Sequence, residues 1–234
     1  GIGTRVGQEN LPIPTSMKIH QGFLQNSEQW FALRRGRATA SQFKRIITPA
    51  KGDYSKASRS YMLELVAECF CPTYAAFMGN YWTDRGNELE PEARDSLAEK
   101  LGLEIEQVGF VTPGPSRPWK DSVGCSPDGL VKGGDGGYLA GVEIKCPSPA
   151  THVEYVLGGV LPDEYKPQVH GGMAITGLNE WHFYSFYPGM KPLHVVVYRD
   201  AFTAQLEAHI DRFILEYADL RARVVPQLQV GGGE

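Results

Sequence analysis

Two acidic residues and one lysine in the middle of the chain have the types and the spacing of a centre that cleaves phosphodiesters. Asp128 lies in a Pro-Asp-Gly turn, and Glu143 and Lys145 lie further on, in the run Gly-Val-Glu-Ile-Lys. Side chains of a strand alternate between its two faces, so Glu143 and Lys145 share one face. Val142 and Ile144 share the other face and point into the core. We expect the two carboxylates and the ammonium to meet at the end of a β-hairpin.

Carboxylate oxygens are the ligands that Mg²⁺ prefers, and water and a substrate phosphate can complete its coordination shell. A lysine beside them can stabilise the attacking water of a hydrolysis or take its proton. The same residues also fit a surface hairpin with an ion pair between its strands, because Asp…Glu-x-Lys is short enough to occur by chance. The spacing alone leaves both interpretations open.

The positive charge of the chain is concentrated near its N-terminus, although the 234 residues together have a formal net charge of −4. Residues 1–60 hold ten Lys or Arg and three Asp or Glu, a net charge of +7, whereas residues 61–234 have a net charge of −11. Eight of the basic residues lie between positions 34 and 59, where Asp53 is the one acidic residue. Such asymmetry is typical of a surface that binds a polyanion, and a solvated face is the alternative.

A phosphate site is expected inside this basic region, at the junction of two helices. Asn26 or Ser27 is placed to cap a first helix that Gly36 closes. The run Thr39-Ala40-Ser41-Gln42 has the pattern of a capping box that opens a second helix. The free backbone N–H groups of that second helix, together with Arg34 and the Ser41 hydroxyl, would bind a phosphate.

The composition argues against a membrane-spanning, a secreted or a disulfide-rich protein. Hydrophobic residues make up 42% of the chain, enough for a sizeable core, but no run approaches the ~20 apolar residues that cross a bilayer. The N-terminus has no signal-peptide pattern. The four cysteines have neither the number of a disulfide framework nor the spacing of a metal site. We therefore expect a cytoplasmic protein with free thiols and no membrane contact.

The remaining patterns predict the elements that must hold these residues. Gly133 to Gly137 form the turn of the hairpin. Further strands are expected over 104–111, 119–125, 180–187 and 193–199, and further helices over 58–69, 83–100, 149–158, 163–176 and 201–224, with caps at Ser58, Thr83, Ser148 and Asp200. This order predicts one α/β domain over 26–225, with a central mixed sheet flanked by helices, between an N-terminal arm at 1–25 and a flexible tail at 226–234.

The helix expected over 83–100 carries a third acidic residue of interest. Glu90 borders its apolar stripe and could reach an interior site, although acidic residues are common in this stretch. Pro91 follows directly and should kink the helix or restart it.

Taken together, these motifs resemble the viral recombinase (alkaline exonuclease) family, which includes phage lambda exonuclease and belongs to the PD-(D/E)xK nuclease superfamily. The most specific pair is Ser-Pro-Asp-Gly followed by Glu-x-Lys-Cys-Pro. The matching motifs occur in the family order over about residues 25–200: Trp30-x-x-Leu33-Arg34-x-Gly36-x-x-Thr39-Ala40-Ser41, Arg85-Gly86-x-x-x-Glu90, Cys125 to Leu130, Glu143 to Pro147 and Gln168. The resemblance implies the restriction-endonuclease-like fold.

The resemblance also implies a role for each matching residue of the hairpin. Asp128 and Glu143 match the carboxylates that bind the metal, and the carbonyl of Ile144 completes the shell. Lys145 matches the catalytic lysine. Glu90 matches the helix glutamate that faces the metal ions.

Three further residues are assigned in the same way. Gln168 matches the glutamine near the catalytic centre. Arg34 matches the arginine that holds the 5′-phosphate of the degraded strand, with Ser41 close by.

The activity implied is a Mg²⁺-dependent 5′-to-3′ exonuclease on linear double-stranded DNA, with two metal ions and with Mn²⁺ as a substitute. The implied partners are two further copies of the chain, in a homotrimer ring around DNA, and a single-strand annealing protein. Two alternatives stay open: a restriction-type or repair endonuclease of the same fold, and a non-catalytic module that binds DNA ends.

Overall fold

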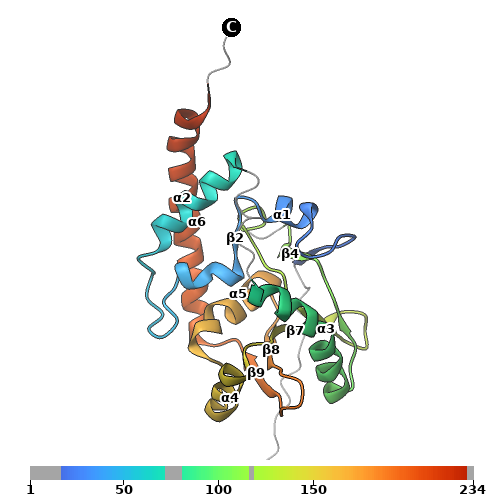
Figure 1. The fold of residues 1–234 in the computed structure, drawn as a ribbon. Coiled ribbons are helices and arrows are strands. Elements are labelled where there is room, and N and C mark those ends of the chain that lie inside the picture. The colour runs from blue at the N-terminus through green and yellow to red at the C-terminus, as the bar shows by residue number, and fades with distance from the viewer. Residues whose placement is uncertain (1–16, 72–80, 116–118, 231–234) are drawn as a thin grey trace, which may run out of the picture.

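A five-stranded mixed sheet with helices on both faces forms the centre of the computed structural model (Figure 1). The structure describes residues 17–71, 81–115 and 119–230, without the side chains of 81–87. Most of the predicted N-terminal arm and the end of the predicted tail therefore lie outside the described residues. None of the helices in the described ranges combines the length and the apolar character that a membrane span requires.

The sheet places the predicted hairpin at its centre. Its strands follow the order β3-β6-β7-β8-β9, with β6 and β7 paired antiparallel and β7 and β8 paired parallel. The bounds are Ile105–Glu106 for β3, Gly129–Lys132 for β6, Tyr138–Lys145 for β7, Glu180–Ser185 for β8 and Leu193–Tyr198 for β9. The predicted α/β fold with a mixed sheet is confirmed.

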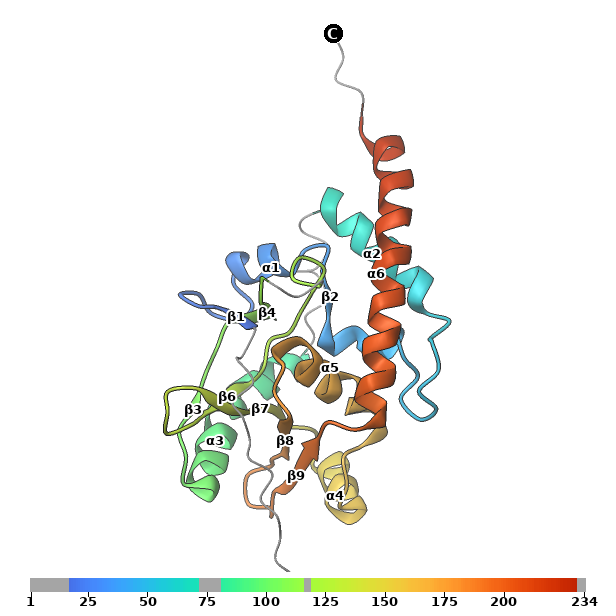
Figure 2. The same ribbon diagram turned by 180° about the vertical axis from the view of Figure 1, so that it is seen from behind.

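Helices cover the two faces of the sheet unequally. On one face α3 (Tyr81–Leu101) packs Ala93 and Leu97 against Val142 and Ile144 of β7. The larger core lies on the other face, where Trp181 and Phe183 of β8 meet residues of three helices. These helices are α2 (Ser58–Phe70), α5 (Lys166–Thr176) and α6 (Ala201–Leu228), and α2 lies alongside the long α6 (Figure 2).

The predicted starts of three helices are confirmed, because the side chain expected to cap each helix accepts a hydrogen bond from its first turn. Ser27 caps α1 (Glu28–Arg34), and Ser148 caps α4 (Pro149–Gly158). Asp200 accepts from the backbone of Phe202 and Thr203 in a full capping box at the start of α6. That helix ends at Leu228, beyond the predicted position 224.

Other helix boundaries were wrong. Thr83 lies inside α3, which begins at Tyr81, and Ser58 is the first residue of α2 rather than its cap. The helix α3 continues through Pro91, so the predicted restart does not occur. The helix predicted over 163–176 begins instead as a short 3-10 helix, η3 (Asp163–Tyr165), which leads into α5.

The two strands predicted before the hairpin were also wrong in extent. The run 104–111 divides into β3 and β4 (Phe110–Pro113), and β4 pairs with β1 (Met17–His20) in a separate two-stranded sheet. The run 119–125 is reduced to β5 (Val123–Gly124), which pairs with β2 (Ala38–Thr39). Alternation of residue types cannot show which partner a short strand will find, and here the partners of β4 and β5 come from the distant N-terminal segment.

Close packing around α5 explains two adjacent glycines in the middle of that helix. A Cβ added at Gly172 would lie 2.4 Å from the Trp181 ring, and one at Gly171 would lie 2.4 Å from the Phe43 ring. Both rings belong to the core on this face of the sheet. Glycine normally weakens a helix, so the ring contacts account for its use here.

We predict that Gly172→Ala lowers the free energy of unfolding by about 1–3 kcal/mol, because a rigid buried ring must move to admit the methyl group. Gly158→Ala in α4 is the matched control, since nothing lies within 4 Å of its added Cβ. That variant should be neutral or more stable by up to about 1 kcal/mol. Chemical denaturation measures both, and equal stability of Gly172→Ala and the wild type would contradict the packing account.

Candidate active site

The hairpin register brings Asp128 to the carboxyl end of β7. Its backbone N–H donates to the carbonyl of Val142 at 3.0 Å, and its Oδ2 accepts from the N–H of Ile144 at 2.6 Å. Val142 and Ile144 are buried under α3, so Glu143 between them faces the opposite side of the sheet. These hydrogen bonds place Asp128 at the end of the hairpin, against the backbone on either side of Glu143.

Glu143 is the most enclosed of the candidate acidic residues. Its side chain is 4% exposed, and its Oε1 contacts the Lys145 Nζ at 2.5 Å. The same oxygen accepts from Nε2 of Gln168, on α5, at 2.7 Å. The Lys145 ammonium also lies 5.0 Å from the centre of the Tyr165 ring. Glu143, Lys145 and Gln168 therefore form one connected cluster.

Glu90 joins this cluster from the other face through an arginine. Arg94, one turn further along α3, forms an ion pair with the Glu90 carboxylate. Arg94 also donates from Nε to the carbonyl of Asp128 at 2.7 Å. One side chain thus ties Glu90 to the backbone of the hairpin.

The carboxylates outnumber the cations that compensate them, and the pKa values reflect this. Burial, together with repulsion from Glu143 and Glu90, raises the pKa of Asp128 well above its usual range. Burial and the charge of Glu143 also raise the pKa of Glu90, against the attraction of Arg94. For Lys145, burial opposes the charged form, but Glu143 and Asp128 raise its pKa above the ordinary value. The lysine is therefore an ammonium at neutral pH.

This donor set fits a hard divalent cation in its chemistry. Asp128, Glu143 and Glu90 offer carboxylate oxygens, and a cation would relieve the repulsion that raises two of their pKa values. Within the described part of the chain, however, no three His, Cys, Asp or Glu side chains already converge as a metal-binding group. Glu90 is turned to Arg94, and Glu143 to Lys145 and Gln168.

Arg34 lies in a second cluster, among hydroxyl groups. Its Nη1 donates to Ser126 Oγ at 3.1 Å and its Nη2 to Thr39 Oγ1 at 3.4 Å, while its guanidinium carbon lies 4.0 Å from the centre of the Trp30 ring. None of the ion pairs among the described residues involves Arg34. Burial lowers the pKa of Arg34 to about 10, so the guanidinium is still charged at neutral pH. A half-buried cation that makes no ion pair among the described residues is suited to an anionic ligand.

The capping box predicted at positions 39–42 was wrong. Thr39 makes no capping hydrogen bond, and the segment after it is η1 (Ala40–Arg45), a 3-10 helix of six residues. The Thr39 hydroxyl instead contacts Arg34 and, at 3.4 Å, the Ser41 Oγ. A helix N-terminus therefore does not form the expected phosphate site, although Arg34 and Ser41 do lie together.

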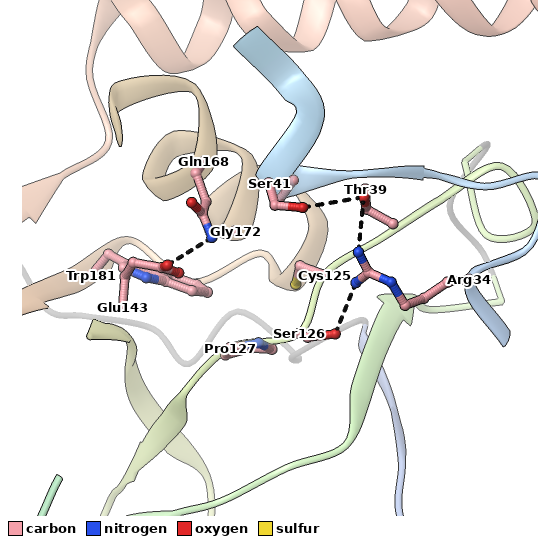
Figure 3. Close-up of a pocket in the computed structure, with 11 residues that line it drawn as sticks. Arg34, Thr39, Ser41, Cys125, Ser126, Pro127, Glu143, Gln168, Gly172 and Trp181 are labelled. Carbon is pink, nitrogen blue, oxygen red and sulfur yellow. Dashed lines mark hydrogen bonds between the residues drawn. The ribbon is translucent and has the colours of Figure 1, made fainter. Parts of the chain in front are cut away.

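One pocket connects the two clusters, as Figure 3 shows. Arg34, Thr39 and Ser41 line one end, and Glu143 and Gln168 line the other. Cys125 and Pro127 lie between these ends, and Gly172 and Trp181 complete the end that holds Glu143 and Gln168. Asp128 directly follows Pro127 in the sequence.

Sequence reasoning missed three contributors to this site. Arg94 could have been found, because residues four apart on a helix face each other and Glu90 was already a candidate. Ser126 stood inside the quoted motif but received no role. Tyr165 carries no local signal, since only the tertiary fold places its ring beside Lys145. Trp30, named above only as part of the motif, is buried and donates from Nε1 to Ser126 Oγ at 2.9 Å.

Comparison with solved structures places this architecture among exonucleases. An alkaline exonuclease (LHK-Exo) from Laribacter hongkongensis is 30% identical, with a TM-score of 0.72 over 86% of this chain and 97% of that one. LHK-Exo in complex with dAMP matches at 28% identity and a TM-score of 0.67, over 86% of this chain and 100% of that one. A phage-related exonuclease from Haemophilus somnus 129PT shares the fold at 16% identity, with a TM-score of 0.58 over 83% and 99% of the two chains.

Comparison of the sequence with known proteins gives the family. No curated protein matches the chain. The model of the YqaJ-like viral recombinase domain matches residues 29–179, a segment that contains every candidate residue of the pocket and the hairpin. This match and the alkaline exonuclease structures support a nuclease role. The chain belongs to the YqaJ-like viral recombinase domain family.

Proposed function

We propose that the chain is a Mg²⁺-dependent exonuclease that degrades one strand of linear double-stranded DNA from a 5′-phosphorylated end. It releases mononucleotides and leaves a 3′ single strand for recombination. The observation that supports this proposal is the shared pocket, in which the guanidinium of Arg34 and the carboxylate of Glu143 line opposite ends. Across the part of the chain that the structure describes, Arg34 makes no ion pair. A site that binds a terminal phosphate beside a cleavage centre selects ends rather than internal positions.

Arg34 binds the terminal phosphate in this account. Its hydrogen bonds to the Thr39 and Ser126 hydroxyls and its stacking on Trp30 fix the guanidinium before DNA arrives. The neutral hydroxyls leave its charge available, and Ser41 adds a further donor at the same end of the pocket. A fixed, partly desolvated guanidinium loses little conformational entropy when it binds phosphate.

Mg²⁺ is the cofactor proposed, with two ions and with Mn²⁺ as a substitute. Asp128, Glu143, Glu90 and the carbonyl of Ile144 would hold it. When bound, the metal lowers the pKa of a coordinated water and stabilises charge on the phosphate oxygens. Glu143 and Glu90 would exchange their present contacts with Lys145 and Arg94 for the metal.

Lys145 acts as a cation rather than as a proton acceptor. The two carboxylates beside it raise its pKa, so it enters the reaction protonated. From Nζ it stabilises the negative charge that develops at the phosphate during the attack of water. Gln168, which donates to Glu143 Oε1, keeps that carboxylate oriented.

The proposal also includes the assembly and the partner that the family resemblance implies. Three copies of the chain would form a ring around duplex DNA, and a single-strand annealing protein would take up the exposed 3′ strand. Light scattering of the purified protein measures the mass of the assembly directly.

The reaction itself gives the first prediction. Linear duplex with 5′-phosphates should be converted to mononucleotides in Mg²⁺, and removal of the metal with a chelator should stop the reaction. Covalently closed circles of the same sequence should resist, because they offer no end to the Arg34 pocket. Discrete internal fragments would favour an endonuclease, and tight binding to ends without any cleavage would favour a non-catalytic module.

Lys145→Ala should lower the cleavage rate by ~10²–10³-fold, the usual effect of removing one positioned charge from a reaction centre. DNA binding should persist, since Arg34 is untouched. Lys132→Ala is the control: it removes a lysine from the neighbouring strand of the same hairpin, where the ammonium pairs with Glu104 and Glu106. A cooperative thermal unfolding transition should show that both variants are folded. If the two folded variants then cleave at equal rates, Lys145 has no role in the mechanism.

Arg34→Ala should reduce cleavage of 5′-phosphorylated duplex more than cleavage of the same duplex with a 5′-hydroxyl. The reason is that, in this proposal, the terminal phosphate is the part of the DNA that the guanidinium would contact. Arg35→Ala, an exposed neighbour, controls for general attraction to DNA and should leave the ratio of the two rates unchanged. An equal loss of both rates in Arg34→Ala would contradict the assigned role.

A further inference from the structure

The two sides of the phosphate pocket are joined by one short turn. Arg34 ends α1, and Thr39 ends β2, with Gly36 between them. Gly36 has a φ of +68°, in the left-handed region that favours glycine. The conformation of this turn sets the distance between the guanidinium and the Thr39 hydroxyl.

Both backbone groups of Gly36 are held by side chains from distant helices. Its N–H donates to Glu68 Oε2, on α2, at 3.0 Å. Its carbonyl accepts from the Tyr217 hydroxyl, on α6, also at 3.0 Å. A Cβ at this position would lie 3.0 Å from Cys69 Sγ and 3.5 Å from the Tyr217 hydroxyl, so the turn fits tightly between the two helices.

A third contact fixes the far side of the same turn. The backbone N–H of Thr39 donates to the buried Tyr61 hydroxyl, on α2, at 2.9 Å. The rings of Tyr61, Phe213 and Tyr217 pack against one another, with centroids 5.5 and 6.2 Å apart along the series. The hydroxyls that hold the turn are thus themselves fixed by the α2–α6 core.

Glu68 supports the turn without pairing with the pocket cation. Among the described residues it makes no ion pair with Arg34, although its charge favours the charged form of the guanidinium. Its carboxylate is instead committed to the Gly36 N–H. The arginine therefore gains electrostatic support while its donors stay open to a phosphate.

We propose that Glu68 and Tyr217 are positioning residues that set the preference for a 5′-phosphate by fixing the Gly36 turn between Arg34 and Thr39. The inference rests on the proposed function, since it concerns the same phosphate pocket. It makes the C-terminal helix α6, which contributes no side chain to that pocket, a determinant of which DNA ends are accepted.

The test compares cleavage rates on one duplex that carries either a 5′-phosphate or a 5′-hydroxyl. Tyr217→Phe removes only the hydroxyl and keeps the ring in the core. The ratio of the two rates should fall by about threefold to tenfold, the effect of one lost hydrogen bond to a group that must be aligned. The rate on the 5′-hydroxyl duplex should stay near that of the wild type, because the cleavage centre is unchanged.

Tyr54→Phe is the matched control. It removes another hydroxyl that contacts α6, the one bonded to Glu216 at 2.8 Å, with no contact to the Gly36 turn. A loss of stability alone would affect both variants, whereas only Tyr217→Phe should change the ratio of rates.

Substitutions of Glu68 provide a second, independent test of the same proposal. Glu68→Gln keeps an oxygen that accepts from Gly36 N–H and should retain the preference, whereas Glu68→Ala should reduce it about threefold to tenfold. Loss of the preference in Glu68→Ala with its rescue in Glu68→Gln would support a positioning role.

The outcomes separate this inference from the proposed function. If the wild type prefers 5′-phosphate and Arg34→Ala abolishes the preference, but Tyr217→Phe and Glu68→Ala keep the wild-type ratio, the inference is wrong and the function stands. An equal fall of both rates in Tyr217→Phe would also overturn it. If the wild type shows no preference for a 5′-phosphate, the phosphate pocket and this inference fail together.

Discussion

The pairing of β6 with β7 is the constraint on which the candidate site depends. It places Asp128 against the backbone of Val142 and Ile144, where the charge of Glu143 raises the pKa of the Asp128 carboxyl. Two like charges held together in a partly buried place repel each other unless a cation joins them, and Lys145 and Arg94 supply only part of that compensation. The fold thus brings more carboxylates than cations together, which raises the pKa values of Asp128 and Glu90, and a bound metal ion would favour their charged forms.

At the Arg34 end of the pocket the imbalance of charge is in the opposite direction, toward positive charge. Arg34 is held by hydroxyls and an aromatic ring, and among the described residues no carboxylate neutralises it. Arg34, which makes no ion pair among the described residues, and a group of carboxylates that Lys145 and Arg94 compensate only in part therefore line or adjoin one pocket. In the proposed function a DNA end would contact both, because its terminal phosphate is an anion and its next phosphodiester could share a metal with the acidic residues.

Much of this site could be predicted from the sequence because its signals are local. Alternation in β7 separated Glu143 and Lys145 from Val142 and Ile144, and Ser27, Ser148 and Asp200 marked helix starts by their own hydrogen bonds. The predictions that failed concern segments whose structure depends on tertiary contacts. Thr39 does not cap a helix because its hydroxyl contacts Arg34 and Ser41, and the strands around 104–125 divide because their partners are distant segments. No local sequence pattern marks Tyr165, Glu68 or Tyr217, whose contacts with Lys145 and with the Gly36 turn arise only in the tertiary fold.

The central claim is that the pocket binds the 5′-terminal phosphate and that cleavage occurs next to it. The most direct test uses a linear duplex with distinguishable labels on the first and the last nucleotide of one strand, and follows both labels through a single encounter. The account predicts that the 5′-terminal label is released first, as a mononucleotide, while the 3′-terminal label remains in long product. Release of the 3′ label first, or of either label in an oligonucleotide, would contradict it.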